Sequence, residues 1–152
     1  MIGPIERLLM NSTVELAVGS GSFEDYKQNF DALIKNFGKM VNISEDWMER
    51  LKRGGAEIFV RSKLDGAEQI EDEEKREEEI IRYASDLFEA AVYTRNKGVV
   101  DLVVKKTSST LQKRRPDIAL ERAVYLIEKG YFEEAIKLAG PYAELGKDLR
   151  HL

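Results

Sequence analysis

The segment 22–37, SFEDYKQNFDALIKNF, decides the fold class of this chain. Its large apolar side chains recur at spacings of three and four residues, at Phe23, Tyr26, Phe30, Leu33 and Phe37. This spacing places them on one face of an α-helix, which has about 3.6 residues per turn. Ser22 predicts an N-cap, and Gly38 predicts the end of the helix. The segment therefore predicts an amphipathic helix with one buried face.

Similar signals for helices lie on the N-terminal side and directly after this segment. Pro4 suits the first turn of a helix that reaches Val18, because proline needs no backbone donor there. Ser44 predicts the N-cap of a shorter helix, and the glycine pair 54–55 predicts its end. Three helices are thus expected before residue 56.

The rest of the chain is also predicted to be mainly helical. Apolar residues at helical spacing predict helices over 72–97 and 99–111. Pro116 breaks the chain, and an antiparallel pair of helices follows on either side of Gly130. We expect one main helical domain over 1–115 and a C-terminal helical hairpin over 116–152 that packs on it as one unit.

One stretch, residues 57–70, has the character of a strand. Ile58 to Val60 favour β structure, and Asp65-Gly66 suits a hairpin turn. A loop fits the same residues. The sequence therefore predicts an all-α bundle of about six to eight helices, with a small β-hairpin near residues 57–70 as an alternative to a loop.

The composition excludes several classes of chemistry. The chain has 152 residues, a net charge of −4 and no cysteine, so disulfides and thiolate metal sites are ruled out. His151 is the sole histidine, which leaves serine–histidine catalysis without a base. We expect a non-enzymatic protein with no catalytic residue, bound metal or cofactor. The overall acidity argues against a uniformly basic DNA-packaging protein.

Several features predict a cytoplasmic protein that does not enter membranes. Residues 1–7 lack the basic and apolar regions of a signal peptide. The run 99–104 is the longest apolar-rich segment, far below the roughly 20 residues of a membrane span. The absence of cysteine and the abundance of Lys, Arg and Glu are typical of thermophiles.

An acidic block opens the predicted helix 72–97. Glu74, Glu77 and Glu78 lie at helical spacing and share one face, as carboxylates do in two-metal hydrolases. The second acidic pair of such enzymes, Glu-x-x-Asp, occurs nowhere in the chain. A solvated helix start explains the block equally, because acids there interact favourably with the helix dipole. A metal-dependent nucleotide hydrolase remains an alternative.

The strongest functional signal is a run of bases in an acidic protein. Between residues 95 and 115 only Asp101 opposes seven bases, which leaves a net charge of +6. These seven, here called the basic strip, are Arg95, Lys97, Lys105, Lys106, Lys113, Arg114 and Arg115. Such a strip predicts sequence-independent contact with the phosphates of DNA or RNA. Pairing of the same bases with the chain's own acids is the alternative.

The layout resembles the small helical subunit of archaeal type I (I-A-like) CRISPR interference complexes, known as Cascade. The residues that carry the resemblance are the segment 18–23, Asp25-Tyr26, the stretch 57–66 and the basic strip. The resemblance implies an accessory subunit in antiviral defence. Such a subunit contacts the nucleic-acid backbone and other protein subunits and catalyses no reaction.

A second resemblance is to the helical A domain of archaeal GINS replication subunits. The segment 23–35 is similar to that family's early helix, and 95–102 is similar to its Arg-x-x-Lys-Ile-Val segment. It implies a scaffold subunit in DNA replication, although the helices after Pro116 replace the small β domain of that family. A third alternative is a protein-binding helical adaptor built on the C-terminal hairpin.

Overall fold

The computed structural model describes residues 3–37 and 42–142, and all of its regular structure in these ranges is helical. No strand occurs there, so the predicted all-α class is confirmed. The helices are α1 (Pro4–Gly19), α2 (Phe23–Phe37), α3 (Glu45–Glu68), α4 (Glu73–Tyr93), α5 (Lys97–Arg114), α6 (Pro116–Glu128) and α7 (Phe132–Ala139), followed by the short 3₁₀ helix η1 (Gly140–Tyr142).

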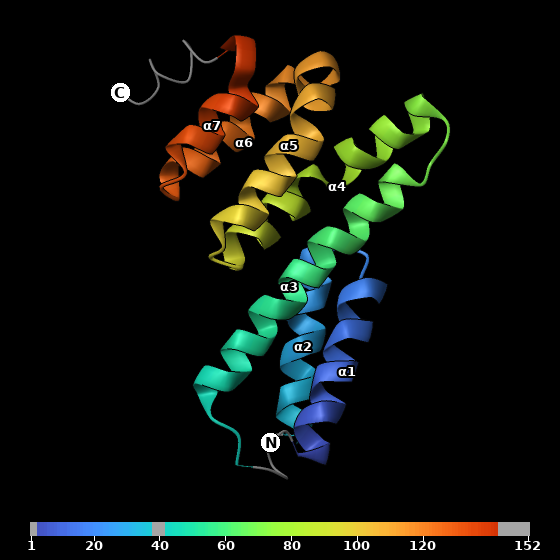
Figure 1. The fold of residues 1–152 in the computed structure, drawn as a ribbon, viewed down its shortest axis with the longest axis vertical. Coiled ribbons are helices and arrows are strands. Elements are labelled where there is room, and N and C mark those ends of the chain that lie inside the picture. The colour runs from blue at the N-terminus through green and yellow to red at the C-terminus, as the bar shows by residue number, and fades with distance from the viewer. Residues whose placement is uncertain (1–2, 38–41, 143–152) are drawn as a thin grey trace.

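Helix α3 is the longest element and connects two groups of helices (Figure 1). On one side, α1 and α2 pack against α3 and against each other. Further along, α3 packs on α4, α4 packs on α5, and α6 and α7 cover α5. The molecule is therefore a helical stack, with α1 and α2 at one end and the α6–α7 hairpin at the other.

The predicted N-caps are confirmed where the helices begin. The backbone N–H of Asp25 donates to the Ser22 hydroxyl at 3.0 Å, and that of Trp47 donates to Ser44 at 3.2 Å. Each bond satisfies a donor that has no partner within the helix. The start of α2 is also attached to α4, because the Phe23 N–H donates to Asp86 at 3.1 Å.

Two predictions about α3 are wrong. Residues 57–68 belong to this helix, so the hairpin suggested for 57–70 does not form, and α3 continues through the glycine pair at which it was expected to end. The reason is burial. The buried side chains of the helix follow helical spacing, and packing of such a face outweighs weak intrinsic β preferences. They include Ala56, Phe59, Val60, Leu64 and Ala67.

Gly55 lies where side chains of α1 and α2 approach the backbone of α3 closely. The hydroxyl of Tyr26 donates to the Lys52 carbonyl at 2.7 Å, one turn before Gly55. A Cβ at position 55 would lie 2.7 Å from Cζ of Tyr26 and 2.8 Å from Cγ2 of Thr13. The glycine therefore makes room for neighbouring helices and does not end its own.

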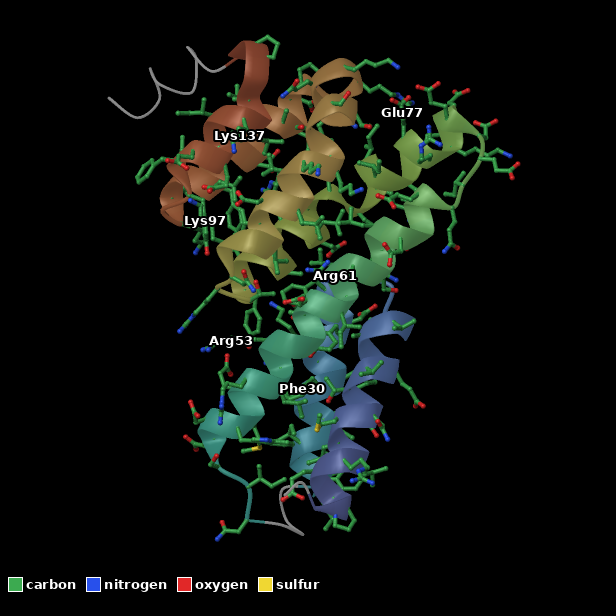
Figure 2. The ribbon with its side chains drawn as sticks, viewed as in Figure 1. Phe30, Arg53, Arg61, Glu77, Lys97 and Lys137 are labelled. Atoms are coloured by element: carbon green, nitrogen blue, oxygen red, sulfur yellow. The ribbon has the colours of Figure 1, made fainter. Side chains whose placement is uncertain are left out.

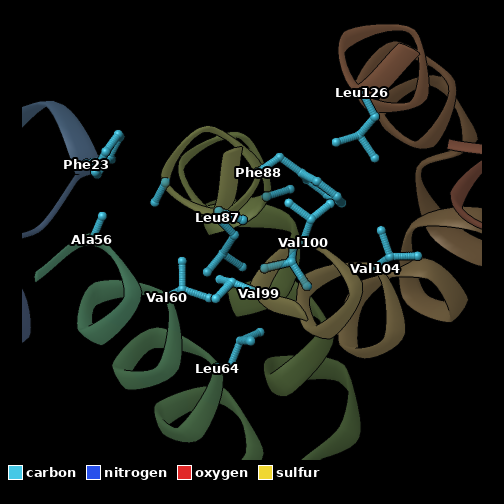
Figure 3. Packing of buried hydrophobic residues seen from close by; sticks show 14 of the residues in the cluster. Phe23, Ala56, Val60, Leu64, Leu87, Phe88, Val99, Val100, Val104 and Leu126 are labelled. Carbon is cyan, nitrogen blue, oxygen red and sulfur yellow. The ribbon is translucent and has the colours of Figure 1, made fainter. Parts of the chain in front are cut away.

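One continuous hydrophobic core runs through the molecule (Figure 3). Near α2 it is aromatic, with Phe23 and Tyr26 fully buried, whereas between α4 and α7 it consists largely of valine, leucine and alanine. The predicted core face of α2 is confirmed for its first three aromatic residues. Leu33 and Phe37 are half-buried.

The C-terminal hairpin begins where it was predicted. Pro116 is the first residue of α6, and Gly130, with φ of +91°, turns the chain toward α7. Gly38 and His151 lie outside the described residues. None of the helices in the described ranges combines the length and apolar content that crossing a bilayer requires.

Candidate functional site

The basic strip extends along the whole of α5 and does not form one face. Arg95 precedes the helix in the left-handed region, with φ of +57°, and the Asn96 side chain caps α5 by accepting from the Gly98 N–H at 2.9 Å. Successive residues of an α-helix rotate by about 100°. Lys106 therefore lies half a turn around the helix from Lys97, so the two point to opposite sides of α5.

At the start of α5, Lys97 is paired with the first turn of α7. Its Nζ lies 3.5 Å from carboxylate oxygens of both Glu133 and Glu134. These two carboxylates, Glu133 first, raise the pKa of Lys97. Glu134 is only 3% exposed, so Lys97 is the cation that accompanies a buried acid. This base is therefore part of the contact between α5 and α7.

From the middle of α5 to its C-terminal end, three bases pair with acids of α3 and α4. Lys106 Nζ lies 2.6 Å from a carboxylate oxygen of Glu68. Lys113 and Arg114 lie 3.6 and 3.8 Å from Glu77, whose side chain is only 14% exposed. Glu77 and Lys97 lie on opposite sides of this part of the molecule (Figure 2). The two ends of the strip thus contact different elements.

Arg115 forms a two-bond pair with the first turn of α6. Its Nε and Nη2 donate to the Asp117 carboxylate at 3.1 and 2.9 Å. The hydrogen bond from Arg115 is the main cause that lowers the pKa of Asp117. The pair connects α5 and α6 across the break made by Pro116, so Arg115 also has a local structural partner.

Two bases of the strip remain without an acidic partner. Arg95 and Lys105 are exposed, and no carboxylate of the described residues lies within 4.0 Å of either. The other five each pair with an acid of the chain. Because exposed ion pairs contribute little stability, about 0–1 kcal/mol, phosphate oxygens can still compete for some of these bases. The strip nevertheless offers far less free charge than its sequence predicts.

The acidic start of α4 supplies partners for α5. Glu77 turns toward Lys113 and Arg114, whereas Glu74 and Glu78 are exposed. Within residues 3–37 and 42–142, no three acidic, histidine or cysteine side chains gather at metal-binding distance. The carboxylates named for the hydrolase alternative therefore do not form a joint site in this part of the chain.

A second surface, which was not among the predicted sites, lies on the outer side of α6. It is an open hollow of about 540 Å³, here called the α6 hollow, and all of its lining residues belong to this one helix. Its apolar centre is flanked by acids and one arginine. The lining residues are Asp117, Leu120, Glu121, Arg122, Val124, Tyr125 and Glu128.

The polar groups of the α6 hollow are only partly satisfied by the chain. The Arg122 guanidinium stacks on the Tyr125 ring at 4.9 Å and donates to Glu121 at 2.8 Å. Its Nε is buried and has no acceptor. Burial is the main cause that raises the pKa of Tyr125, followed by Glu89. A buried donor without a partner costs about 1–3 kcal/mol. Binding of a partner that lets Arg122 rearrange and find an acceptor can recover this free energy.

Helix α7 adds two exposed apolar side chains to the hairpin. Phe132 is 49% exposed and Ile136 is 40% exposed, and four residues apart they lie on one side of the helix. The end of α7 is held by α5, because Gln112 Nε2 donates to the carbonyls of Lys137 and Leu138 at 3.0 and 2.9 Å. The hairpin thus presents apolar groups on a firmly attached support.

The sequence did carry a signal for this surface. Helix α6 has apolar residues around most of its circumference, more than one buried face requires, and such a helix needs a second neighbour. The apolar residues are Ile118, Ala119, Leu120, Ala123, Val124, Tyr125, Leu126 and Ile127. Ala119, Ala123 and Leu126 are buried in the core, and Ile118, Tyr125 and Ile127 pack against it. Leu120 and Val124 remain on the outer side.

Comparison with protein-family models, with curated proteins and with solved structures finds no match for this chain. The resemblances to the Cascade small subunit and to GINS therefore stay predictions. The β element that formed part of the first resemblance is helical here, since residues 57–66 lie within α3.

Proposed function

We propose that this chain is a non-catalytic adaptor subunit that binds other proteins through its α6–α7 hairpin. The observation that carries the proposal is the α6 hollow, an apolar depression on the outer side of a helix whose inner side already packs in the core. Of the surfaces described, it alone combines apolar lining with a buried polar group that has no partner.

The lining indicates the chemistry of the partner. Leu120 and Val124 are one helical turn apart and, with Tyr125, match the apolar face of an amphipathic helix. Three acids and one arginine surround them, so the rim favours a segment that carries lysine or arginine beside its apolar residues. The proposed partner is therefore an amphipathic, basic helical segment of another protein.

Affinity capture from an extract of the source organism tests this proposal. The wild-type chain, immobilised after nuclease treatment and washed at high salt, should retain one defined protein. Val124→Asp places a charge in the apolar centre of the hollow and should lose that protein. Met10→Asp on α1, which places the same charge on an exposed apolar residue at the other end of the molecule, should retain it. Retention by both variants, or by neither, contradicts the proposal.

Contact with nucleic-acid phosphates is the second candidate function. It is favoured by the exposure of Arg95 and Lys105, which have no acidic partner among the described residues. Combined with the two resemblances, phosphate contact would make the chain a subunit of a CRISPR interference complex or of a replication scaffold. In this candidate function, the free bases Arg95 and Lys105 should contribute more to phosphate binding than the five bases that already pair with acids.

Two double variants of equal charge test the second candidate. Arg95→Gln with Lys105→Gln should weaken binding to a random DNA or RNA oligonucleotide at low salt. The slope of log K against log salt should then fall by roughly two, since each phosphate contact contributes about 0.9. Lys97→Gln with Lys106→Gln, which removes paired bases, should change it less. Equal effects of the two pairs, or unchanged binding, reject the assignment.

A further inference from the structure

The outer face of α1 is exposed and partly apolar along its whole length. Its inner face is buried against α2 and α3 through Leu9, Thr13 and Ala17. The outer residues recur at spacings of three and four, as in a helix that packs along another helix. This set, here called the α1 stripe, consists of Pro4, Arg7, Leu8, Asn11, Val14, Glu15 and Val18, all exposed.

The α1 stripe has the composition of an interface. Of the six large hydrophobic residues exposed in the described chain, three lie in the stripe, and Val18 is 51% exposed. Arg7 and Glu15 are the two charged residues of the stripe, and its centre between them, formed by Leu8, Asn11 and Val14, is uncharged. Interface centres are depleted of charge in the same way.

The charges of the stripe identify what covers it. Arg7 and Glu15 lie at equal distances along the helix on either side of Asn11. Neither has an ion-pair partner within 4.0 Å among residues 3–37 and 42–142. Arg7 of one copy can therefore pair with Glu15 of a second copy, and Glu15 with Arg7.

We infer that the chain forms a homodimer in which two α1 helices pack antiparallel across a two-fold axis at Asn11. In this arrangement each residue faces the one equally far on the other side of Asn11. Arg7 then faces Glu15 of the second copy, and Leu8 faces Val14 of the second copy. A parallel arrangement would instead place Arg7 against Arg7. Charge complementarity thus selects the antiparallel form, which is the self-complementary contact expected of a two-fold dimer.

Asn11 lies at the centre of the stripe, where it meets its own copy. The two amides can each donate to and accept from the other, and a single polar residue in an apolar seam is a known way to set register. The interface is short, because a helix of sixteen residues spans about 24 Å. We therefore expect a reversible dimer at the small end of specific interfaces.

Sedimentation equilibrium over a concentration series tests the dimer by charge reversal. Arg7→Glu alone and Glu15→Arg alone each place two like-charged pairs across the axis and should raise the dimer Kd by about tenfold. An equimolar mixture of these two variants should dimerise like the wild type, because the heterodimer restores both attractive pairs. The double variant in one chain should also recover. All of these positions are exposed, so circular dichroism should show unchanged folding.

Val14→Asp should abolish dimerisation, since it places a charge in the apolar seam. A wild-type chain that stays monomeric throughout the series overturns the inference, and so does a dimer that persists in Val14→Asp. A mixture that fails to recover does the same. This test is independent of the proposed adaptor function, because Val124→Asp should leave the dimer unchanged.

Discussion

The two ends of the molecule build their cores from different side chains. Around Phe23 the core is aromatic, with ring centroids 6.0 Å from Tyr26, 5.8 Å from Phe59 and 5.6 Å from Tyr93. Around α5 to α7 the fully buried hydrophobic residues are valine, leucine and alanine, such as Val103. The comparison shows that one chain can use few large rings at one end and many small side chains at the other.

The polar contacts differ between the two ends in the same way. The aromatic end is joined mainly by hydrogen bonds of phenols, since Tyr26 donates to the Lys52 carbonyl and Tyr93 donates to Glu49 at 2.9 Å. One ion pair, Lys52 with Asp31 at 2.9 Å, also joins α3 to α2 there. The aliphatic end is joined by ion pairs, of which Lys97 with the buried Glu134 is the least exposed on its acidic side. We therefore expect the stability of the aromatic end to depend on side-chain shape and to fall at alkaline pH. The stability of the aliphatic end should depend on the charges of its ion pairs.

The largest expected effect is loss of a ring from the aromatic core. Phe23→Ala removes a fully buried side chain that contacts three other rings, and should lower the free energy of unfolding by about 3–5 kcal/mol. Phe132→Ala, the same change at an exposed site, should cost no more than about 0.5 kcal/mol. Urea denaturation of both variants measures the difference, and similar losses would refute it.

The glycine pair of α3 offers a smaller and more local test. Gly55→Ala places a methyl group against Tyr26 and Thr13 and should destabilise by about 1–3 kcal/mol. At Gly54 a Cβ meets nothing within 4 Å, so Gly54→Ala should stabilise by up to about 1 kcal/mol through helix propensity. Thermal denaturation should thus give opposite signs for adjacent residues. A shared sign would contradict the packing described here.

The hydroxyl of Tyr26 is expected to contribute about 1 kcal/mol, measured as the stability lost in Tyr26→Phe. Burial is the main cause that raises its pKa above the value of about 10 of an unfolded tyrosine. Because the folded state then holds the proton more tightly, this stability is fully present below the pKa of the unfolded state, about 10. It is lost as pH rises toward the raised value in the folded state.

Alkaline denaturation of Tyr26→Phe provides the measurement. The variant should lose stability less steeply than the wild type as pH rises above about 10. Phenolate absorbance should show tyrosines that ionise only when the protein unfolds, and their number should fall by one in the variant. Identical alkaline slopes for the two proteins would count against the buried phenol.

The smallest effect concerns the ion pairs of α5. Lys97→Met leaves the buried Glu134 without its cation. Lys106→Met removes the cation of Glu68, but that side chain is half exposed and stays solvated. The melting temperature should therefore fall more in Lys97→Met, because an unpaired acid is costly only where water is excluded. Calorimetry at low salt compares the two. A larger fall in Lys106→Met would reverse the assignment.

The starts of the helices were predictable because their causes are local. Ser22 and Ser44 cap helices by bonding to backbone groups three residues away, and Pro116 restricts the residue before it. The apolar spacing of 23–37 likewise depends on one helix alone. Neighbouring elements are not needed to infer any of these features, so the all-α class follows from the chain itself.

The candidate sites depend on residues far apart in the chain and were therefore harder to predict from the sequence. All seven bases of the basic strip lie on or next to α5, although the sequence placed Arg95 and Lys97 at the end of the predicted helix 72–97. Their pairing depends on acids such as Glu68, Glu77 and Glu134, on three other helices. The α6 hollow was missed for a similar reason. An apolar residue is available to a partner only if no other helix covers it, and sequence spacing does not show which helices do.

The sequence by itself determined the helices and most of their starts, because capping and periodicity act within one or two turns. Only the tertiary structure decided that α3 continues past Gly55, since this depends on how closely Tyr26 approaches. It also decided which cations are free and which apolar faces stay open. These properties arise from contacts between residues far apart in the chain, and such contacts form only when the helices pack.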